Sequence, residues 1–161
     1  MHYVEPDLDV LQAVIVGDVL VRDRPFVQFN PKTPMSEILQ RAASATWQQV
    51  FPVVDEAGAL RGLITADALR FVAAEREVEA WTIAADVAEP PVVVPSEADL
   101  RSAAELLLTS GLRQLPVVEN GGVIADFLDE LDVSRAYLDA TAPGEAPGAP
   151  GGPGNGGGAS G

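Results

Sequence analysis

The chain has 161 residues and carries 10 Lys and Arg against 24 Asp and Glu, which gives a net charge of −14 and a pI of about 4.2. This acidic excess excludes nucleic acid as a main partner and argues against docking on an anionic membrane, because both select clustered basic side chains. Cysteine is absent and the single histidine is His2, which excludes thiolate chemistry, zinc-thiolate sites and catalysis by a central histidine.

Hydropathy predicts a protein without a membrane span. No apolar run approaches the roughly 20 residues that cross a bilayer. The N-terminus also lacks the basic stretch followed by an apolar segment that marks a signal peptide. We therefore expect a cytoplasmic protein with no direct membrane insertion of this segment.

The first half of the chain predicts a helix followed by a unit of strand, helix, two strands and helix. Residues 7–15 are expected to form a helix that packs against the second half. A short strand is expected over 26–29, and Thr33 and Pro34 resemble the N-cap and first-turn proline of the next helix. The apolar positions of that helix have the spacing of one helix face: Met35, Ile38, Leu39, Ala42 and Ala43. The remaining elements expected are strands over 50–54 and 60–65 and a helix over 66–79.

The same order of elements returns in the second half. Phe51-Pro52-Val53-Val54 recurs 64 residues later as Leu115-Pro116-Val117-Val118. A strand is expected over 92–94, and the next helix has Ser96 and Asp99 spaced as in a capping box and Gly111 as its stop. The apolar face of that helix is predicted to be Leu100, Ala103, Ala104, Leu107 and Leu108. The remaining elements expected are strands over 114–118 and 123–128 and a helix over 129–140.

This duplication predicts the fold. A single unit of ~60 residues is marginal alone, because small domains bury a low fraction of their surface. We predict an α+β (α/β layered) fold of two βαββα repeats, packed through their sheets with pseudo-two-fold symmetry. The expected domains are residues 1–79, with the N-terminal helix and first repeat, and residues 80–140, with the second. Residues 141–161 hold nine of the 15 glycines and four of the 13 prolines, which predicts a disordered tail.

With both copies in view, the sequence resembles a tandem pair of CBS domains, often called a Bateman module. The resemblance spans about residues 7–140. In the first copy it rests on Gly17-Asp18-Val19, Phe51-Pro52-Val53-Val54-Asp55, Gly58 and Gly62-Leu63-Ile64-Thr65. In the second copy it rests on Ala85-Asp86-Val87, Leu115-Pro116-Val117-Val118-Glu119, Gly122 and Phe127-Leu128-Asp129-Glu130-Leu131-Asp132.

Two stretches, 84–87 and 127–138, resemble more narrowly the cytosolic tails of prokaryotic ClC-type chloride channels and transporters. This resemblance implies a regulatory portion of a transmembrane chloride channel or transporter, at the cytosolic face of the membrane. CBS pairs usually form disc-like homodimers, so the resemblance also implies a homodimer. A stand-alone CBS sensor protein is an alternative that the sequence leaves open.

The resemblance implies a binding module rather than an enzyme. CBS pairs commonly bind ATP, ADP or AMP between the copies, and Mg²⁺ would arrive with the nucleotide. The family motif is Gly, two apolar residues, Thr or Ser, two residues, then Asp. A hydroxyl beside a helix N-terminus suits a phosphate, and the Asp can accept hydrogen bonds from ribose hydroxyls. The ligand-binding residues implied are Val21, Phe51, Pro52, Thr65, Asp67, Arg70, Val92, Leu115, Pro116, Asp129, Asp132 and Arg135.

The first copy matches half of this motif. Gly62 and Thr65 are in place, but the Asp stands at 67 and Ala68 takes its expected position. Arg70 follows Asp67 by about one helical turn, within reach of a phosphate. The alternative for Thr65 is a plain helix N-cap.

The second copy matches the other half. Asp132 is in place, with Arg135 three residues on, but Asp126 replaces the Gly and Asp129 replaces the Thr. Asp129 would set a negative charge where a phosphate belongs, and its alternative is a helix cap. The alternative for Asp132 is a solvated residue in a first helical turn. The three aspartates do not have the spacing of a calcium loop, so no metal site is predicted.

Four aromatic or apolar residues, Phe51, Leu115, Trp47 and Trp81, have more than one possible role. Phe51 and Leu115 could flank an adenine, but residues before a Pro-Val-Val strand are more often core. Trp47 ends the first apolar stripe and Trp81 stands at the joint between copies, and we expect both to be packing or interface residues.

Two functional hypotheses therefore stand. The first is a CBS-pair module that dimerises and senses an adenine nucleotide. The second is the same fold without a ligand, acting in dimerisation or coupling. An enzyme is not expected, because the sequence shows no nucleophile-base pair and no Gly-rich phosphate loop of the Walker type.

Overall fold

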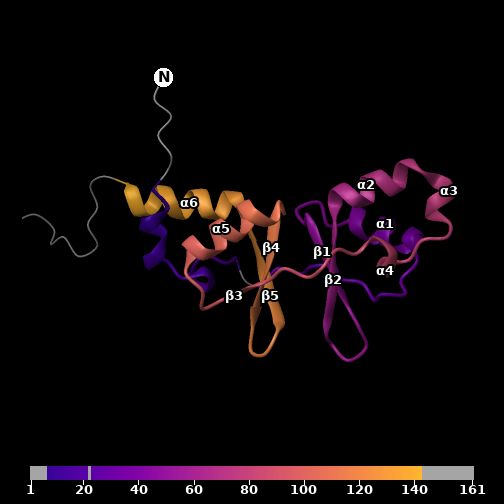
Figure 1. Cartoon of the computed structure of the whole chain (residues 1–161), viewed down its shortest axis with the longest axis horizontal. Coiled ribbons are helices and arrows are strands. Elements are labelled where there is room, and N and C mark those ends of the chain that lie inside the picture. The colour runs from indigo at the N-terminus through magenta and orange to yellow at the C-terminus, as the bar shows by residue number, and fades with distance from the viewer. Residues whose placement is uncertain (1–6, 22, 143–161) are drawn as a thin grey trace, which may run out of the picture.

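The computed structural model of the chain describes residues 7–21 and 23–142, and it repeats one order of elements twice (Figure 1). The first half contains η1 (Leu8–Ala13), η2 (Val16–Asp18), α1 (Met35–Ala43), β1 (Val50–Val54), β2 (Leu60–Thr65), α2 (Ala66–Ala74) and α3 (Arg76–Glu79). The second half contains α4 (Ala84–Val87), β3 (Val94–Pro95), α5 (Leu100–Ser110), β4 (Gln114–Glu119), β5 (Val123–Asp129) and α6 (Glu130–Thr141).

Each repeat is built on an antiparallel hairpin. β1 pairs with β2, with Phe51 opposite Ile64, and β4 pairs with β5, with Leu115 opposite Leu128. β3 adds to β4 in parallel, whereas the strand expected over 26–29 is reduced to a single parallel bridge of Phe29 to β1. Two sheets lie near the middle of an elongated molecule, with the helices toward its two ends (Figure 1). The prediction of an α+β pair of repeats is confirmed.

Each of the two hydrophobic cores contains residues from both halves of the chain. The first core includes Ala84 from α4, although most of its members come from the first repeat: Phe29, Met35, Ile38, Ala45, Phe51, Val53, Ile64, Leu69 and Val72. The second core includes Leu11 of η1 and Val16 of η2, and its other buried members come from the second repeat: Val94, Leu100, Ala103, Ala104, Leu107, Leu115, Val117, Leu128 and Ala136. The N-terminal helix therefore packs on the second repeat, as predicted, although it is a 3-10 helix.

Backbone hydrogen bonds show which parts of the two repeats correspond. The N–H of Met35, first in α1, donates to the Thr82 carbonyl at 3.0 Å, and the N–H of Leu100, first in α5, donates to the Val14 carbonyl at 2.7 Å. Thr82 is therefore the counterpart of Val14. The same alignment makes α3 the counterpart of η1, since both helices begin six residues before these positions (82 − 76 and 14 − 8).

Two helix starts differ from the prediction. The N-cap of α1 is Pro34, which offers no side-chain acceptor, and the Thr33 hydroxyl accepts instead from the Asn30 N–H at 3.1 Å. α5 begins after Asp99, whose carboxylate accepts from the backbone N–H three residues on. Ser96 is too far from the helix to cap it, because an N-cap side chain reaches only the second or third N–H beyond itself.

The predicted helix faces hold for most positions and fail at the last. Ala43 is exposed and Leu108 is 70% exposed, because eight residues turn a helix by about 80° and carry the side chain off the buried face. The helix expected over 66–79 breaks at Glu75, which has φ −116° and ψ 76°. Gly111 ends α5 with φ 71°, as predicted for a helix stop.

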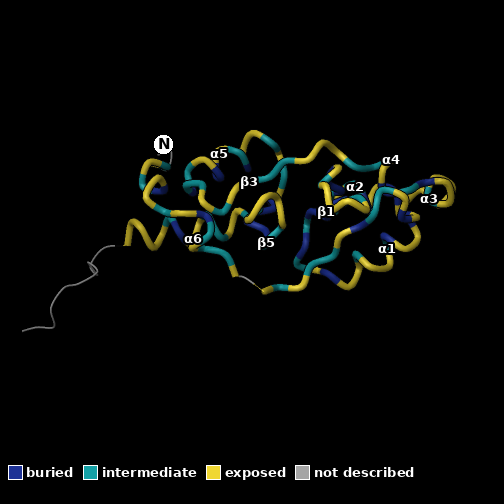
Figure 2. Tube along the Cα trace, turned by 90° about the horizontal axis from the view of Figure 1, so that it is seen from below, coloured by how far each residue is buried: buried dark blue, intermediate teal, exposed yellow. Residues whose placement is uncertain are grey.

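The predicted tail, 141–161, lies outside the described residues from 143 onward, and so does His2; Thr141 itself is the last residue of α6. Within residues 7–21 and 23–142, no helix is long and apolar enough to cross a membrane. Buried positions are most continuous in the strands, whereas α1, α3 and α6 are exposed over much of their length (Figure 2).

Candidate functional sites between the repeats

The Gln114 side chain joins the two repeats where β1 approaches β4. Gln114 is 2% exposed; it accepts from the Gln49 N–H at 2.7 Å and donates to the Trp47 carbonyl at 3.1 Å. Gln48, also 2% exposed, exchanges hydrogen bonds with the backbone of Val27. On the two sides of this contact lie two related regions, which we call the first and the second site.

The first site forms at the N-terminus of α2. The Thr65 hydroxyl accepts from the Ala68 N–H at 3.1 Å and so caps the helix. Asp67, in the first turn, forms ion pairs with Arg70 of the same helix and with Arg113 of the second repeat at 3.5 Å. The hydrogen bond from Arg70 and the charge of Arg113 lower the pKa of Asp67. Asp67 therefore bridges the repeats and stays ionised.

The cavity at the first site is small, about 20 Å³, lined by Gln49, Val50, Thr65, Ala66, Asp67, Gly111, Leu112 and Arg113. That volume holds about one water molecule. Arg70 and Arg113 are 65% and 67% exposed, so both guanidinium groups can swing outward to admit a larger ligand. The positive end of the α2 dipole and two guanidinium groups suit phosphate oxygens.

The second site forms at the N-terminus of α6 and is acidic. Asp129 caps the helix by accepting from the Asp132 N–H at 2.8 Å, and Asp132 accepts in return from the Asp129 N–H at 3.0 Å. Burial raises the pKa of Asp132, and the charge of Asp129 raises it further. Arg135 is exposed on α6. The carboxylates that replace motif residues here bind donors of the chain itself.

Asp126, which stands where the first repeat has Gly62, is the most buried acidic group in the described part of the chain at 1% exposed. It accepts from the Val21 N–H at 3.0 Å and from the Arg24 guanidinium at 2.9 and 3.2 Å. The same guanidinium lies over the Trp47 ring, 4.0 Å from its centroid. Val21 therefore belongs to the second site.

The strand residues of the predicted ligand set lie inside the protein. Phe51, Pro52, Leu115 and Pro116 are all buried, and Phe51 packs against Phe29 in the first core. Val92 is half-buried against the second core. None of these side chains lines the first-site cavity.

The two tryptophans have different surroundings. Trp47 is half-buried and packs on Phe127 with ring centroids 5.7 Å apart, as expected for a packing residue. Trp81 is 88% exposed, so it is not a packing residue within the chain, and its expected role at an interface remains a prediction.

Two basic residues of these sites are missing from the sequence prediction. Arg113 pairs with Asp67 across the two repeats. Its position directly before the strand 114–119 could have indicated this role in the sequence, because the edge of that strand lies between the repeats. Arg24 lies in an irregular segment that carries no motif. Its partner Asp126 is 102 residues away, and no local pattern links the two.

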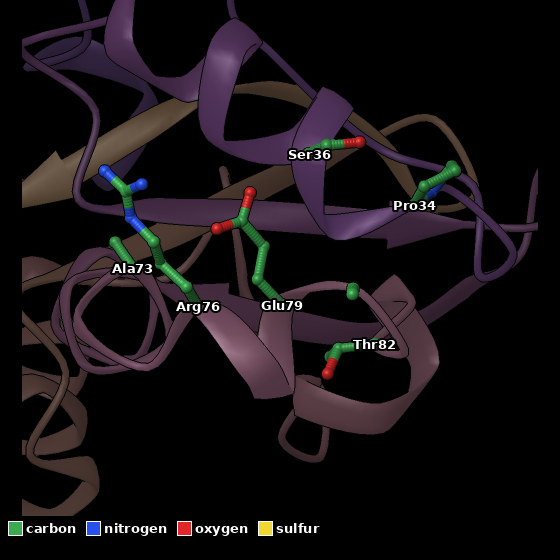
Figure 3. Close-up of a pocket in the computed structure, with 7 residues that line it drawn as sticks. Pro34, Ser36, Ala73, Arg76, Glu79 and Thr82 are labelled. Atoms are coloured by element: carbon green, nitrogen blue, oxygen red, sulfur yellow. The ribbon is translucent and has the colours of Figure 1, made fainter.

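A cavity of about 560 Å³ lies away from both sites, between α1, α2 and α3. Arg76 and Glu79 extend from α3 toward α1 across this space (Figure 3). Their counterparts in the second repeat are Leu8 and Leu11 of η1, which fill the equivalent position against α5 and α6. Beside this cavity the first repeat therefore has charged residues where the second repeat has leucines.

The duplicated architecture defines a tandem pair of related repeats, and the family comparison identifies it. Residues 16–75 and 84–139 both match the CBS domain family. The chain belongs to this family and contains a tandem CBS pair. No curated protein matches the sequence.

Solved structures of CBS pairs are similar to this chain. CBSX2 of Arabidopsis thaliana, solved in complex with AMP, is 27% identical, with a TM-score of 0.61, over 78% of this chain and 96% of that one. The CBS domain of a bacterial CNNM/CorC family Mg²⁺ transporter, in complex with ATP, is 20% identical, with a TM-score of 0.67, over 80% and 89%. The CBS domain of a membrane protein from Sphaerobacter thermophilus is 22% identical, with a TM-score of 0.62, over 80% and 91%.

Proposed function

We propose that this chain is a cytoplasmic regulatory module that binds an adenine nucleotide (ATP, ADP or AMP, with Mg²⁺ carried by the nucleotide) at the first site and dimerises. The nucleotide would contact Thr65, Asp67 and Arg70 from the first repeat and Arg113 from the second. The proposed division into residues 1–79 and 80–140 places this site at the boundary between the two domains.

The observation that carries this proposal is the charge distribution at the first site. A chain with 10 basic residues in total places two of them, Arg70 and Arg113, beside one helix N-terminus. They belong to different repeats, so a phosphate held by both would fix the repeats relative to each other. AMP in the plant relative, 27% identical, supports the same class of ligand here.

Calorimetric titration of ATP with Mg²⁺ into the full chain tests the proposal. We expect saturable binding that weakens roughly 10- to 100-fold in Arg113→Ala, because a hydrogen bond to a charged group contributes roughly 1.5–3 kcal/mol. Arg61→Ala is the matched control, since Arg61 is 66% exposed and pairs with Asp55 on the β1–β2 hairpin. Equal affinities for the two variants would remove Arg113 from the site.

The competing function is structural coupling without a ligand. The 20 Å³ cavity of the first site and the carboxylates of the second favour it. It predicts a dimer whose melting temperature is indifferent to millimolar ATP, ADP and AMP. A stabilisation that grows with nucleotide concentration would refute it, because a ligand that binds only the folded state must stabilise that state.

Dimerisation is proposed through the helices of the second repeat. Leu108 of α5 and Leu131 and Leu138 of α6 are 70%, 56% and 64% exposed, and the two α6 residues share one helix face. We expect Leu131→Glu/Leu138→Glu to sediment as a monomer. Val123→Glu, on the β4–β5 hairpin and 65% exposed in the parent, is the control that should leave the dimer intact.

The partner proposed is a transmembrane chloride channel or transporter of the ClC type, joined covalently or separate. The resemblance of residues 84–87 and 127–138 to such tails supports it. A stand-alone sensor is the alternative. Co-purification of the full chain with a ClC-type membrane protein from the same cells would favour the transporter.

A further inference from the structure

Two of the differences between the second site and the first fill space at equivalent positions. Gly62 and Gly111 of the first site correspond to Asp126 and Trp47 of the second. At Gly62 a Cβ atom would lie 2.7 Å from the Glu89 carbonyl oxygen, since the backbone there crosses directly over the strand. At the second site a carboxylate and an indole occupy these places.

The backbone segments that cross β2 at the first site and β5 at the second site also differ. At the first site two backbone hydrogen bonds join the segment to the strand: the Leu63 N–H donates to the Glu89 carbonyl at 2.9 Å, and the Glu89 N–H donates to the Leu63 carbonyl at 2.8 Å. At the second site the Val21 N–H donates to the Asp126 side chain. Val21 lies eight positions before Phe29, which forms the bridge to β1, whereas Glu89 lies only five positions before Val94 of β3. The backbone segment that crosses the second site is therefore the longer of the two.

Arg24 lies in that longer segment, and its side chain turns inward over the second site. The guanidinium donates twice to Asp126, lies 4.0 Å from the Trp47 ring centroid and donates to the Phe127 carbonyl at 3.4 Å. Phe26 closes the group by packing edge-on against Phe127 with centroids 5.3 Å apart. The Arg24 side chain is 28% exposed although it carries a full charge.

We infer that the Arg24 side chain is a built-in occupant of the second site and excludes nucleotides from it. The guanidinium satisfies the buried Asp126 carboxylate and covers the Trp47 ring, which is the surface on which a base would stack. A phosphate would have to displace this cation and then face Asp126, Asp129 and Asp132. The pair of repeats therefore takes one nucleotide, and Arg24 sets that stoichiometry; this count rests on the proposed function of the first site.

Trp47 provides a signal from the second site alone. The chain has two tryptophans, and Trp81 is 88% exposed on another part of the surface. In full-length Trp81→Phe protein, the fluorescence therefore reports on Trp47. ATP is titrated with Mg²⁺, and fluorescence and calorimetry are recorded on the same samples. With Arg24 in place we expect one nucleotide per chain and no change in Trp47 emission.

The variant designed to open the second site, which we call the unlocking variant, is Arg24→Ala/Asp126→Gly in the Trp81→Phe background. Glycine is chosen at position 126 because the equivalent residue of the first site is a glycine. We expect saturable quenching of Trp47 and a stoichiometry that rises by one. Arg24→Ala alone should not gain the second nucleotide, since Asp126 remains buried and negative. Arg61→Ala is the control for removing an arginine. If circular dichroism shows that Arg24→Ala/Asp126→Gly is unfolded, Arg24→Gln/Asp126→Asn is used in its place.

Two results would overturn the inference. One is quenching of Trp47 by ATP while Arg24 is intact. The other is an unlocking variant that folds and gains neither quenching nor a further equivalent of nucleotide. If the intact protein binds no ATP at all, the proposed function of the first site fails, yet quenching in the unlocking variant still supports the role of Arg24.

Discussion

Replacing Glu79 by leucine should stabilise the fold, because the second repeat shows what this position accommodates. Its counterpart Leu11 is fully buried. The cavity beside Glu79 has a volume of about 560 Å³, ample for a leucine side chain. Among the described residues the Glu79 carboxylate forms no ion pair that the substitution would remove.

The expected gain follows from burial. Full burial of a leucine contributes about 1.5–3 kcal/mol, and Glu79 is about half-buried, so we expect Glu79→Leu to raise the free energy of unfolding by about 1 kcal/mol. Urea denaturation followed by circular dichroism measures this as a higher midpoint at an unchanged slope. Glu77→Leu, on the exposed side of α3, is the matched control. A variant no more stable than this control would refute the correspondence of α3 with η1.

Four further results are expected from urea denaturation. Arg24→Ala should lower the free energy of unfolding by about 3–5 kcal/mol, because it leaves the buried Asp126 carboxylate without its guanidinium partner. Asp126→Ala should lower it clearly less, because the Arg24 side chain is partly exposed and can turn to water. Gly62→Ala should cost about 1–3 kcal/mol from the steric contact with the crossing backbone. Asp99→Ala should lower the midpoint at neutral pH; the difference should shrink as pH falls below 3.8, because the folded-state pKa of Asp99 is lowered. Asp132→Asn should raise the midpoint at neutral pH; this gain should shrink as pH falls toward 3.8, because the folded-state pKa of Asp132 is raised.

The sequence predicted those features of the fold that local patterns determine. The hairpins follow from apolar runs separated by Gly-containing turns, and the duplicated Pro-Val-Val strands fixed their correspondence. The cap by Asp129 was foreseen because N-cap chemistry acts over three residues. The break after α2 was not foreseen, because residues 66–79 keep a helical composition through Glu75.

The sites were predictable only in part, because their decisive contacts are long-range and polar. Thr65 and Asp67 were identified from their order in a motif, but the motif did not indicate Arg113 as the partner of Asp67. The ion pair of Arg24 with Asp126 joins residues 102 positions apart. Such pairs have no period, and only the folded chain brings their members together.

The two ion-pair clusters differ in how readily a ligand can compete with them. At the first site the partners of Asp67 are exposed arginines, and exposed pairs contribute little net stability because water screens them. A phosphate can take over these guanidinium groups without leaving a buried charge behind. At the second site the loss of Arg24 would strand Asp126 at 1% exposure, which is a severe penalty. The same fold thus presents one site that a ligand can open and one that the chain keeps closed.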